Sequence, residues 1–403
     1  MDQSINQFQS YPSHIAIIGG GRWARVLIEV VSKIVPKNTK LSIFTPNNKI
    51  SMKEWVLEKK LKQSATIYDN FKNFGGHNIE ACLVANAARD HEFAISKCLN
   101  SNIPVLVEKP LTLSYSASLK MVKLARKNKT FIASAHIFLF NSYLTKFSHL
   151  LSSSGKLKSI EIDWSDPIQE NRYGERKKFD PSVPIFFDLL PHIVSIIFVL
   201  TGKCLLKFIN LKFDSGGSAI EIEFRVEDAK CTVRLARNSD IRRRIIRATA
   251  DNYLELDFSG ESGIIKQDSS VIIEDDDWDN DSRPSAKMLS AFLNQSVGKG
   301  SDSRLDVHIG LEANKLIEEI LFSYNKAMVT WLKNNLTSQS LIIDNLIYAL
   351  REILLVNKYS SDEAESLIGQ IQRIIANGSS SDWIDKLEED IDPLKLIRKI
   401  SLN

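Results

Sequence analysis

Histidine and cysteine are scarce in this sequence, whose 403 residues include seven His and four Cys. The cysteines form no CxxC pair, which argues against a structural zinc site or a disulfide framework. We expect small buried thiols in a reducing compartment at Cys82, Cys98, Cys204 and Cys231. We expect no metal site, because most of the histidines are scattered along the chain: His77, His91, His136, His149 and His308.

An excess of charge of one sign is also missing. Lys and Arg number 52, Asp and Glu 49, and the net charge is +3. Binders of nucleic acids or anionic membranes usually show a concentrated basic excess, so we expect neither partner. The longest apolar stretch, residues 183–202, contains Asp188, Pro191 and His192, which are costly in a bilayer. We interpret it as a buried helix. Because the polar N-terminus also lacks the pattern of a signal peptide, we expect a cytoplasmic protein.

The first third of the chain alternates short apolar runs with amphipathic segments, the pattern of a parallel sheet with crossover helices. It predicts strands at 14–18, 41–44, 65–68, 81–85, 105–107 and 131–134. Helices are predicted at 22–34, 52–62, 91–100 and 114–127. We therefore predict an α/β fold that opens with a doubly wound, Rossmann-type domain over residues 12–135.

From about residue 155, polar and apolar residues alternate as in a mostly antiparallel sheet with one covered face. Strands are predicted at 160–164, 208–213, 219–226, 231–236, 244–250 and 253–258, with a turn at 214–217 and helices at 285–294 and 306–325. These elements predict a second, α+β domain over residues 136–331. We interpret the acidic run 274–281 as a solvated loop.

A linker at 337–339 precedes a C-terminal helical extension, residues 341–403. Its helices are predicted at 341–357, 362–376 and 381–400. The extension could be a helical cap, an oligomer contact or a docking module for a partner.

A glycine-rich turn, Gly19-Gly20-Gly21-Arg22-Trp23-Ala24, joins the first predicted strand to a helix. In this G-x-G-x-x-A pattern Gly19 permits the tight turn, and Gly21 lets a pyrophosphate approach the backbone. Ala24 allows the helix to pack close to the strand. The pattern in this strand–turn–helix setting predicts dinucleotide binding.

The end of the second predicted strand bears on the choice of nicotinamide cofactor. NAD sites usually place an Asp or Glu here to bind the ribose hydroxyls, but this chain reads Phe-Thr-Pro-Asn-Asn-Lys from 44 to 49. With no carboxylate to repel a 2′-phosphate, Thr45, Asn47 and Lys49 could hold that phosphate. We therefore expect NADP in preference to NAD.

Two further motifs supply reactive groups. Lys109 follows the predicted strand 105–107 and should point into the crevice at the carboxyl ends of the strands. Asp188 and His192 are four residues apart, which places them on one face of a helix. An Asp–His pair alone is readily structural. Combined with the glycine turn and the lysine, it predicts a catalytic site.

These motifs resemble the glucose-fructose oxidoreductase / inositol dehydrogenase / rhizopine-catabolism (Gfo/Idh/MocA) family over residues 12–331. The similarity lies in GGGRWA at 19–24, VANAARDH at 84–91, VEKPLTLS at 107–114, DLLPH at 188–192 and the segments 285–292 and 303–313. It implies nicotinamide bound between a Rossmann domain and an open-faced α/β domain. It also implies that Lys109 bonds the reacting substrate atom, that His192 is the acid/base, and that Asp188 holds substrate and histidine.

The resemblance implies further contacts around these residues. Cofactor contacts are expected from Gly19, Gly21, Arg22, Trp23, Ala24, Thr45, Asn47, Asn86, His91, Glu108 and Lys109. Contacts with the substrate are expected from His136, Phe138 and Tyr173.

The chain departs from the family pattern in four places. Asn86 and Ala87 replace the Ser/Thr and Pro that are common in the family, and residues 136–140 lack the usual arginine. Residues 184–187 replace the usual flexible glycines, and Ser195 replaces a common aspartate. The resulting apolar pocket argues against a simple polyol or inositol. We expect a small carbonyl, a sugar-like hydroxyl or a cyclic imine, the last because related enzymes reduce thiazoline rings of siderophores.

In such a site the Lys109 ammonium would stabilise developing negative charge, and a histidine with a near-neutral pKa would exchange the proton. Asp188 would orient the imidazole. The nicotinamide carries the redox chemistry, so no metal is needed. The alternative function is a catalytically inactive nucleotide-binding regulator or scaffold that engages a partner through the C-terminal helices.

We expect a homodimer or homotetramer. The second sheet has one strongly apolar face, and a large exposed apolar patch is uncommon on a soluble monomer. That face carries Ile220, Ile222, Phe224, Val226, Val233 and Leu235. The resemblance also implies assembly sheet to sheet. A nearby basic cluster could line the contact, face an anionic substrate or form a solvated rim: Arg234, Arg237, Arg242, Arg243, Arg244 and Arg247.

Overall fold

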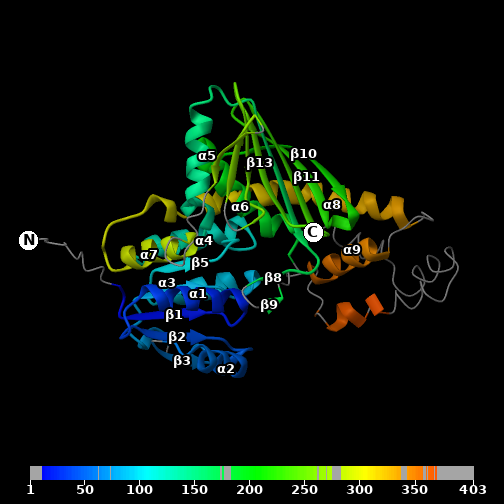
Figure 1. Cartoon of the computed structure of the whole chain (residues 1–403). Helices are drawn as coiled ribbons and strands as arrows, with labels where there is room; N and C mark the ends of the chain where they lie inside the picture. The colour runs from blue at the N-terminus through cyan, green and yellow to red at the C-terminus, as the bar shows by residue number, and fades with distance from the viewer. Residues whose placement is uncertain are drawn as a thin grey trace, which may run out of the picture.

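Two sheets at opposite ends of the molecule form the framework of the fold (Figure 1). The computed structural model describes residues 11–61, 63–72, 74–172, 175–176, 183–260, 263–268, 270–274, 283–336, 343–356, 360, 362–366 and 368–369. Within these ranges no helix is both long enough and apolar enough to cross a membrane.

The first sheet, blue to cyan in Figure 1, has six parallel strands in the Rossmann order β3-β2-β1-β4-β5-β6. The strands are β1 (His14–Ile18), β2 (Lys40–Phe44), β3 (Ser64–Tyr68), β4 (Ala81–Val84), β5 (Val105–Val107) and β6 (Ile132–Ser134). The helices between them are α1 (Arg22–Ile34), α2 (Lys49–Lys59), α3 (His91–Asn100) and α4 (Tyr115–Lys127). The central strands are buried apolar runs, as a parallel sheet covered on both faces requires.

The second sheet has eight strands in the order β10-β11-β12-β7-β13-β14-β15-β16. All neighbours are antiparallel except β7 and β12, which pair in parallel. The strands are β7 (Ser159–Pro167), β10 (Lys207–Asp214), β11 (Ala219–Val226), β12 (Ala229–Ser239), β13 (Arg243–Thr249), β14 (Tyr253–Asp257), β15 (Ile264–Gln267) and β16 (Ser270–Glu274). A separate short pair consists of β8 (Asn171–Arg172) and β9 (Glu175–Arg176).

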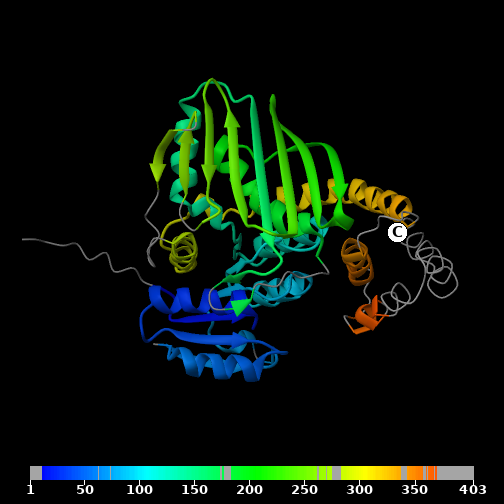
Figure 2. The ribbon, with the colours of Figure 1, turned by 45° about the vertical axis from the view of Figure 1, so that its right-hand side comes forward.

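Three helices lie on one side of the second sheet (Figures 1 and 2): α5 (Ser142–Ser152), α6 (Ile185–Thr201) and α8 (His308–Leu336). A fourth helix, α7 (Pro284–Ser296), packs on α1 between the two sheets. The long apolar stretch is α6, a buried helix as predicted. The predicted fold class is therefore confirmed: a Rossmann sheet followed by an α+β unit with an open-faced, mostly antiparallel sheet.

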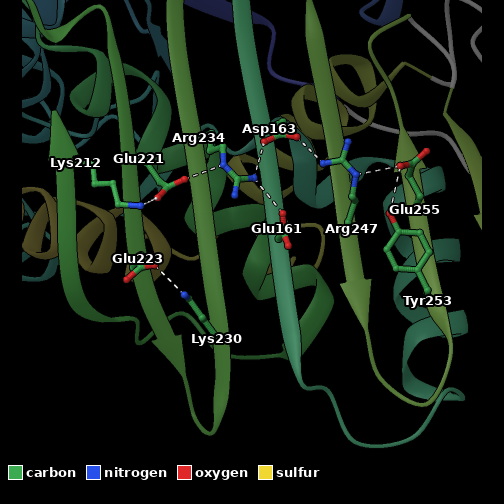
Figure 3. A network of polar contacts seen from close by, with 10 residues as sticks. All are labelled: Glu161, Asp163, Lys212, Glu221, Glu223, Lys230, Arg234, Arg247, Tyr253 and Glu255. Atoms are coloured by element: carbon green, nitrogen blue, oxygen red, sulfur yellow. Dashed lines mark hydrogen bonds and ion pairs between the residues drawn. The ribbon is translucent and has the colours of Figure 1, made fainter. Parts of the chain in front are cut away.

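Over its described residues the second sheet does not expose an apolar face, so the predicted exposed apolar patch is wrong. Its apolar side chains, among them Ile222, Phe224 and Val233, are buried in the protein's own core. The opposite face carries a ladder of ion pairs across six strands (Figure 3). Arg234 bonds Glu221 at 2.8 Å and Glu161 at 3.0 Å, and the pairs continue through Asp163, Arg247, Glu255, Lys212, Glu223 and Lys230. The apolar face is therefore covered within one chain, and assembly into oligomers stays a prediction.

The helical extension is described in part. Helix α9 (Ile343–Val356) lies inside the predicted helix 341–357, and residues 362–366 and 368–369 are also helical. Leu346 and Ala349 of α9 belong to the main hydrophobic core. The predicted linker 337–339, the helix 381–400 and residues 275–281 of the acidic run lie outside the described residues.

Candidate functional site

The glycine turn connects β1 to α1 at the carboxyl end of the first sheet. Gly19 has φ +140°, and a Cβ there would lie 2.5 Å from the Ala85 carbonyl oxygen. A Cβ on Gly20 would lie 2.1 Å from Thr45 Oγ1, so the turn packs directly on the ends of β2 and β4. Gly21 differs, because no atom lies within 4 Å of its Cβ position. Its open side, at the N-terminus of α1, can admit a phosphate group.

A cavity of about 460 Å³ begins at this turn and runs between the two sheets. Arg22, Trp23, Asn86 and Glu108 line the end nearest the turn. Arg22 Nη1, Asn86 Oδ1 and Glu108 Oε1 are buried there without a hydrogen-bond partner. Buried polar atoms are rarely left unpaired, so these atoms suit a polar ligand. The turn and its surroundings thus fit a dinucleotide. Burial raises the pKa of Glu108 to about 6.

Three of the expected cofactor contacts are buried within the protein, and one of them, His91, has polar partners there. Both ring nitrogens of His91 lie near backbone oxygens, Nδ1 at 2.8 Å from Pro110 O and Nε2 at 3.3 Å from Asn86 O. Burial lowers the pKa of His91. His91 therefore braces the loop after β5. Ala24 and Thr45 are buried against the turn.

The end of β2 carries the groups expected near a ribose phosphate. Asn47 is exposed, and Lys49 is paired with Asp69 at 2.6 Å. Among the described residues, Asp69 is the only carboxylate paired with Lys49, and it belongs to the segment after β3.

Lys109 and Asp188 meet in the middle of the cavity. The lysine follows β5, and its ammonium forms an ion pair with Asp188 Oδ1 and donates to the Asp188 carbonyl oxygen at 3.0 Å. The second carboxylate oxygen, Oδ2, accepts from Arg237 Nη2 at 3.1 Å. Burial acts to raise the pKa of Asp188, but Lys109 and Arg237 outweigh it and hold the pKa well below its usual range.

Asp188 therefore does not make the contact with His192 that its spacing suggested. Both carboxylate oxygens bond cations, and His192 Nδ1 is buried without a hydrogen-bond partner. The ring is instead held by aromatic contacts, stacked on Trp164 at 5.7 Å and edge-on to Phe138 at 5.1 Å.

The expected near-neutral histidine is also wrong for this structure. Burial, followed by the positive charge of Lys109, lowers the pKa of His192 well below its ordinary value. The imidazole is neutral at neutral pH, so it can accept a proton but has none to spare as an acid.

The three residues expected to contact the substrate are placed differently relative to the cavity. Phe138 lines the cavity beside His192. His136 is fully buried and is not among the residues that line the cavity, and burial lowers its pKa to about 4. Tyr173 lies outside the described residues.

Sequence analysis grouped several arginines in one basic cluster and did not separate those that reach the cavity. Arg237, Arg242 and Arg244 line the cavity, together with Arg283. Arg244 lies 3.8 Å above the Trp164 ring and is ion-paired to Asp166, and burial lowers its pKa to about 10. Arg242 pairs with Glu170 at 2.6 Å. The alternation of side chains along a strand could have predicted this separation, because it places Arg237 and Arg234 on opposite faces of β12.

The described residues hold no cluster of His, Cys, Asp or Glu suited to a metal ion. The four cysteines are buried and free.

Comparison with known proteins agrees with this geometry. Residues 13–136 match the Gfo/Idh/MocA family model, described as an oxidoreductase family with an NAD-binding Rossmann fold. No curated protein matches the chain by sequence.

Solved structures are similar in fold. UDP-N-acetylglucosamine 3-dehydrogenase from Acidithiobacillus ferrooxidans has 14% identity and a TM-score of 0.62, covering 78% of this chain and 98% of its own. A Gfo/Idh/MocA family oxidoreductase from Vibrio cholerae has 17% identity and a TM-score of 0.60, covering 78% and 99%. Biliverdin reductase from Synechocystis, in complex with biliverdin and NADP⁺, has 16% identity and a TM-score of 0.58, covering 77% and 98%. At these identities the likeness shows a shared fold.

Proposed function

We propose that this chain, whose residues 13–136 belong to the Gfo/Idh/MocA oxidoreductase family, transfers a hydride between NADP and a small carbonyl, hydroxyl or cyclic imine. One observation carries the proposal: Lys109 lines the same cavity as Arg22 and Trp23 of the glycine-rich turn. Asp188 and His192 line it too, which favours an enzyme over a scaffold that only binds a nucleotide.

The dinucleotide would be held by the turn at Gly19–Ala24, with Asn86 and Glu108 offering the unpaired buried oxygens described above. When bound, its nicotinamide supplies or accepts the hydride. NADP is favoured over NAD because β2 ends without a carboxylate, and Lys49 offers a cation there. The pairing of Lys49 with Asp69 weakens this preference without removing it.

Lys109 would stabilise the substrate heteroatom. Its ammonium is fixed by Asp188 on one side and faces the cavity on the other. A positive charge held in place beside an oxygen or nitrogen that becomes more negative lowers the barrier without reorganisation. His192, neutral and with Nδ1 unpaired, would accept the proton released from a hydroxyl in the oxidising direction.

The cavity also limits the substrate. Phe138, Trp164 and Phe258 form an aromatic wall around His192, which suits a planar or cyclic group. Two of the similar structures are named for different ligands, a UDP-sugar and a tetrapyrrole, so the substrate must be sought by experiment.

The proposal is tested by the absorbance of the reduced nicotinamide, with NADPH or NADP⁺ and a panel of ketones, cyclic imines and sugar hydroxyls. We expect turnover that Lys109→Met abolishes and Lys212→Met leaves unchanged, because Lys212 lies in the outer ladder of the second sheet. Calorimetric titration with NADPH and NADH accompanies it. Turnover unaffected by Lys109→Met would refute the role of the lysine, and failure to bind either dinucleotide would refute the function.

A further inference from the structure

The C-terminal helix α9 reaches the back of the candidate active site. The Asn345 carbonyl oxygen lies 2.1 Å from where a Cβ on Gly216 would be, and Gly216 has φ +66°. Only glycine allows this approach, so α9 packs directly on the β10–β11 turn. Tyr348 and Glu352, one turn apart, are 7% and 4% exposed. Figure 2 shows α9, in orange, beside α8.

A line of polar contacts runs from α9 to Lys109. Arg237 Nη1 donates to Tyr348 Oη at 3.3 Å and to the Val183 carbonyl oxygen at 2.9 Å. The same guanidinium donates from Nη2 to Asp188 Oδ2 at 3.1 Å, and Asp188 Oδ1 is paired with Lys109. Arg237 is 4% exposed. A planar guanidinium with partners on two sides has little freedom to turn.

Two carboxylates accompany the two cations of this cluster, and one of the carboxylates comes from α9. Lys109 and Arg237 are both positive, and Asp188 is the carboxylate that bonds both. The second carboxylate is Glu352, which accepts from Tyr324 Oη at 2.6 Å. An unbalanced buried cation is costly. Burial raises the pKa of Glu352 to about 7, and the charge of Arg237 acts against that rise, so the ionised form of Glu352 offsets the charge of Arg237.

We propose that α9 is part of the active site: Tyr348 and Glu352 hold Arg237 against Asp188 and thereby fix the ammonium of Lys109. Arg237, Tyr348 and Glu352 are positioning residues. The consequence for turnover rests on the proposed function, whereas the consequence for the chemical state of Lys109 does not.

The first experiment measures the rate at which acetic anhydride acylates Lys109 in the full-length protein, read by peptide mass spectrometry at one pH. Only an uncharged amine reacts, so the rate reports how strongly the surroundings favour the ammonium. Arg237→Leu leaves Asp188 to act on Lys109 alone, and we expect acylation about tenfold slower. Glu352→Gln leaves Arg237 without its second counter-charge, and we expect faster acylation. Tyr348→Phe removes only a hydroxyl. It should slow the acylation of Lys109 in the same direction as Arg237→Leu, but by a smaller factor.

The matched control is Leu346→Val, which reduces packing on the same helix at a buried position without polar contacts. Its acylation rate should equal that of the wild type. Opposite shifts in Arg237→Leu and Glu352→Gln cannot come from loosened packing, which would move both the same way. Unchanged rates in these two variants and in Tyr348→Phe would overturn the proposal. Should Arg237→Leu fail to fold, Tyr348→Phe and Glu352→Gln decide.

Turnover provides the second readout. In Tyr348→Phe we expect kcat to fall about tenfold while KM for the dinucleotide is unchanged, because Tyr348 is not among the residues that line the cavity. An unchanged kcat would refute the link to catalysis. If the acylation rates shift as expected but no variant or wild type turns over any substrate, the proposed function fails and the positioning of Lys109 stands.

Discussion

Gly19 and Gly21 should respond in opposite ways to the same substitution. Both are in the turn between β1 and α1, and each would gain one methyl group as alanine. In Gly19→Ala the methyl would meet the backbone of Ala85 at 2.5 Å, in a conformation with φ +140°. In Gly21→Ala it would project into open space, and the backbone there, φ −79° and ψ 178°, is an ordinary extended one.

The magnitudes follow from these environments. A non-glycine residue at such a positive φ costs about 1–3 kcal/mol, and the overlap with Ala85 forces the backbone directly after β4 to shift. We therefore expect Gly19→Ala to lose about 2–4 kcal/mol of unfolding free energy. For Gly21→Ala, the reduced freedom of the unfolded chain stabilises by about 0.4–1 kcal/mol. The poorer helix N-cap costs a similar amount. The net change should stay within about 0.5 kcal/mol, yet dinucleotide affinity should fall at least about tenfold, or 1.4 kcal/mol.

Urea unfolding gives the stability of both variants, and the fluorescence of Trp23, which lines the cavity, follows titration with NADPH. A folded Gly21→Ala protein that binds NADPH as tightly as the wild type would refute a pyrophosphate at this turn. A Gly19→Ala protein as stable as the wild type would refute the packing argument.

Four other outcomes are expected. Asp188→Asn should lower the free energy of unfolding by about 2–3 kcal/mol, less than for a fully buried ion pair because the Asp188 side chain is 32% exposed. Since the pKa of Asp188 is lowered in the folded protein, urea unfolding curves should show this loss of stability above about pH 4, and the loss should vanish as the pH falls further. The pH–rate profile of the oxidising direction should lack a limb near pH 6.5, since His192 is already neutral there; a limb near 6.5 that disappears in His192→Ala would contradict this. Arg234→Ala, at a partly exposed ladder position, should cost no more than about 1 kcal/mol, and less in high salt. Light scattering at micromolar concentration should find at least a dimer, and a monomer would end that prediction.

The first sheet could be predicted from sequence almost residue by residue, because its strands are short runs bounded by turn residues and all except the edge strand β3 are largely buried. The predicted strand 14–18 and helices 22–34 and 91–100 match β1, α1 and α3. Fewer strands and helix ends were predicted correctly where the hydrophobic pattern of the sequence is weak. Strands β15 and β16 are short, with exposed residues such as Val271 and Ile272, and α8 runs on to Leu336 past the predicted end at 325.

The candidate site was predictable where a motif marks a single residue, as at Gly19, Lys109 and Asp188. The pairing among these residues was not. Spacing on α6 pointed Asp188 toward His192, but a cation from β12, 49 residues away in sequence, takes the second carboxylate oxygen. The lowered pKa of His192 depends on the surrounding aromatic residues and on Lys109, which no local pattern reveals.

The parallel pairing of β7 with β12 has a consequence for synthesis of the chain. All six strands of the first sheet lie within residues 14–134, so that unit can form while the rest is still being translated. Strand β7 sits at the centre of the second sheet, yet its neighbours are β12 and β13, and its pairing with β12 joins Ser159 to Lys230. Both edges of β7 stay unpaired until β12, which ends at Ser239, has left the ribosome, and the edge that pairs with β13 stays unpaired until Thr249 follows. Such long-range pairings form slowly. Nascent chains paused between these points should therefore be especially prone to capture by chaperones.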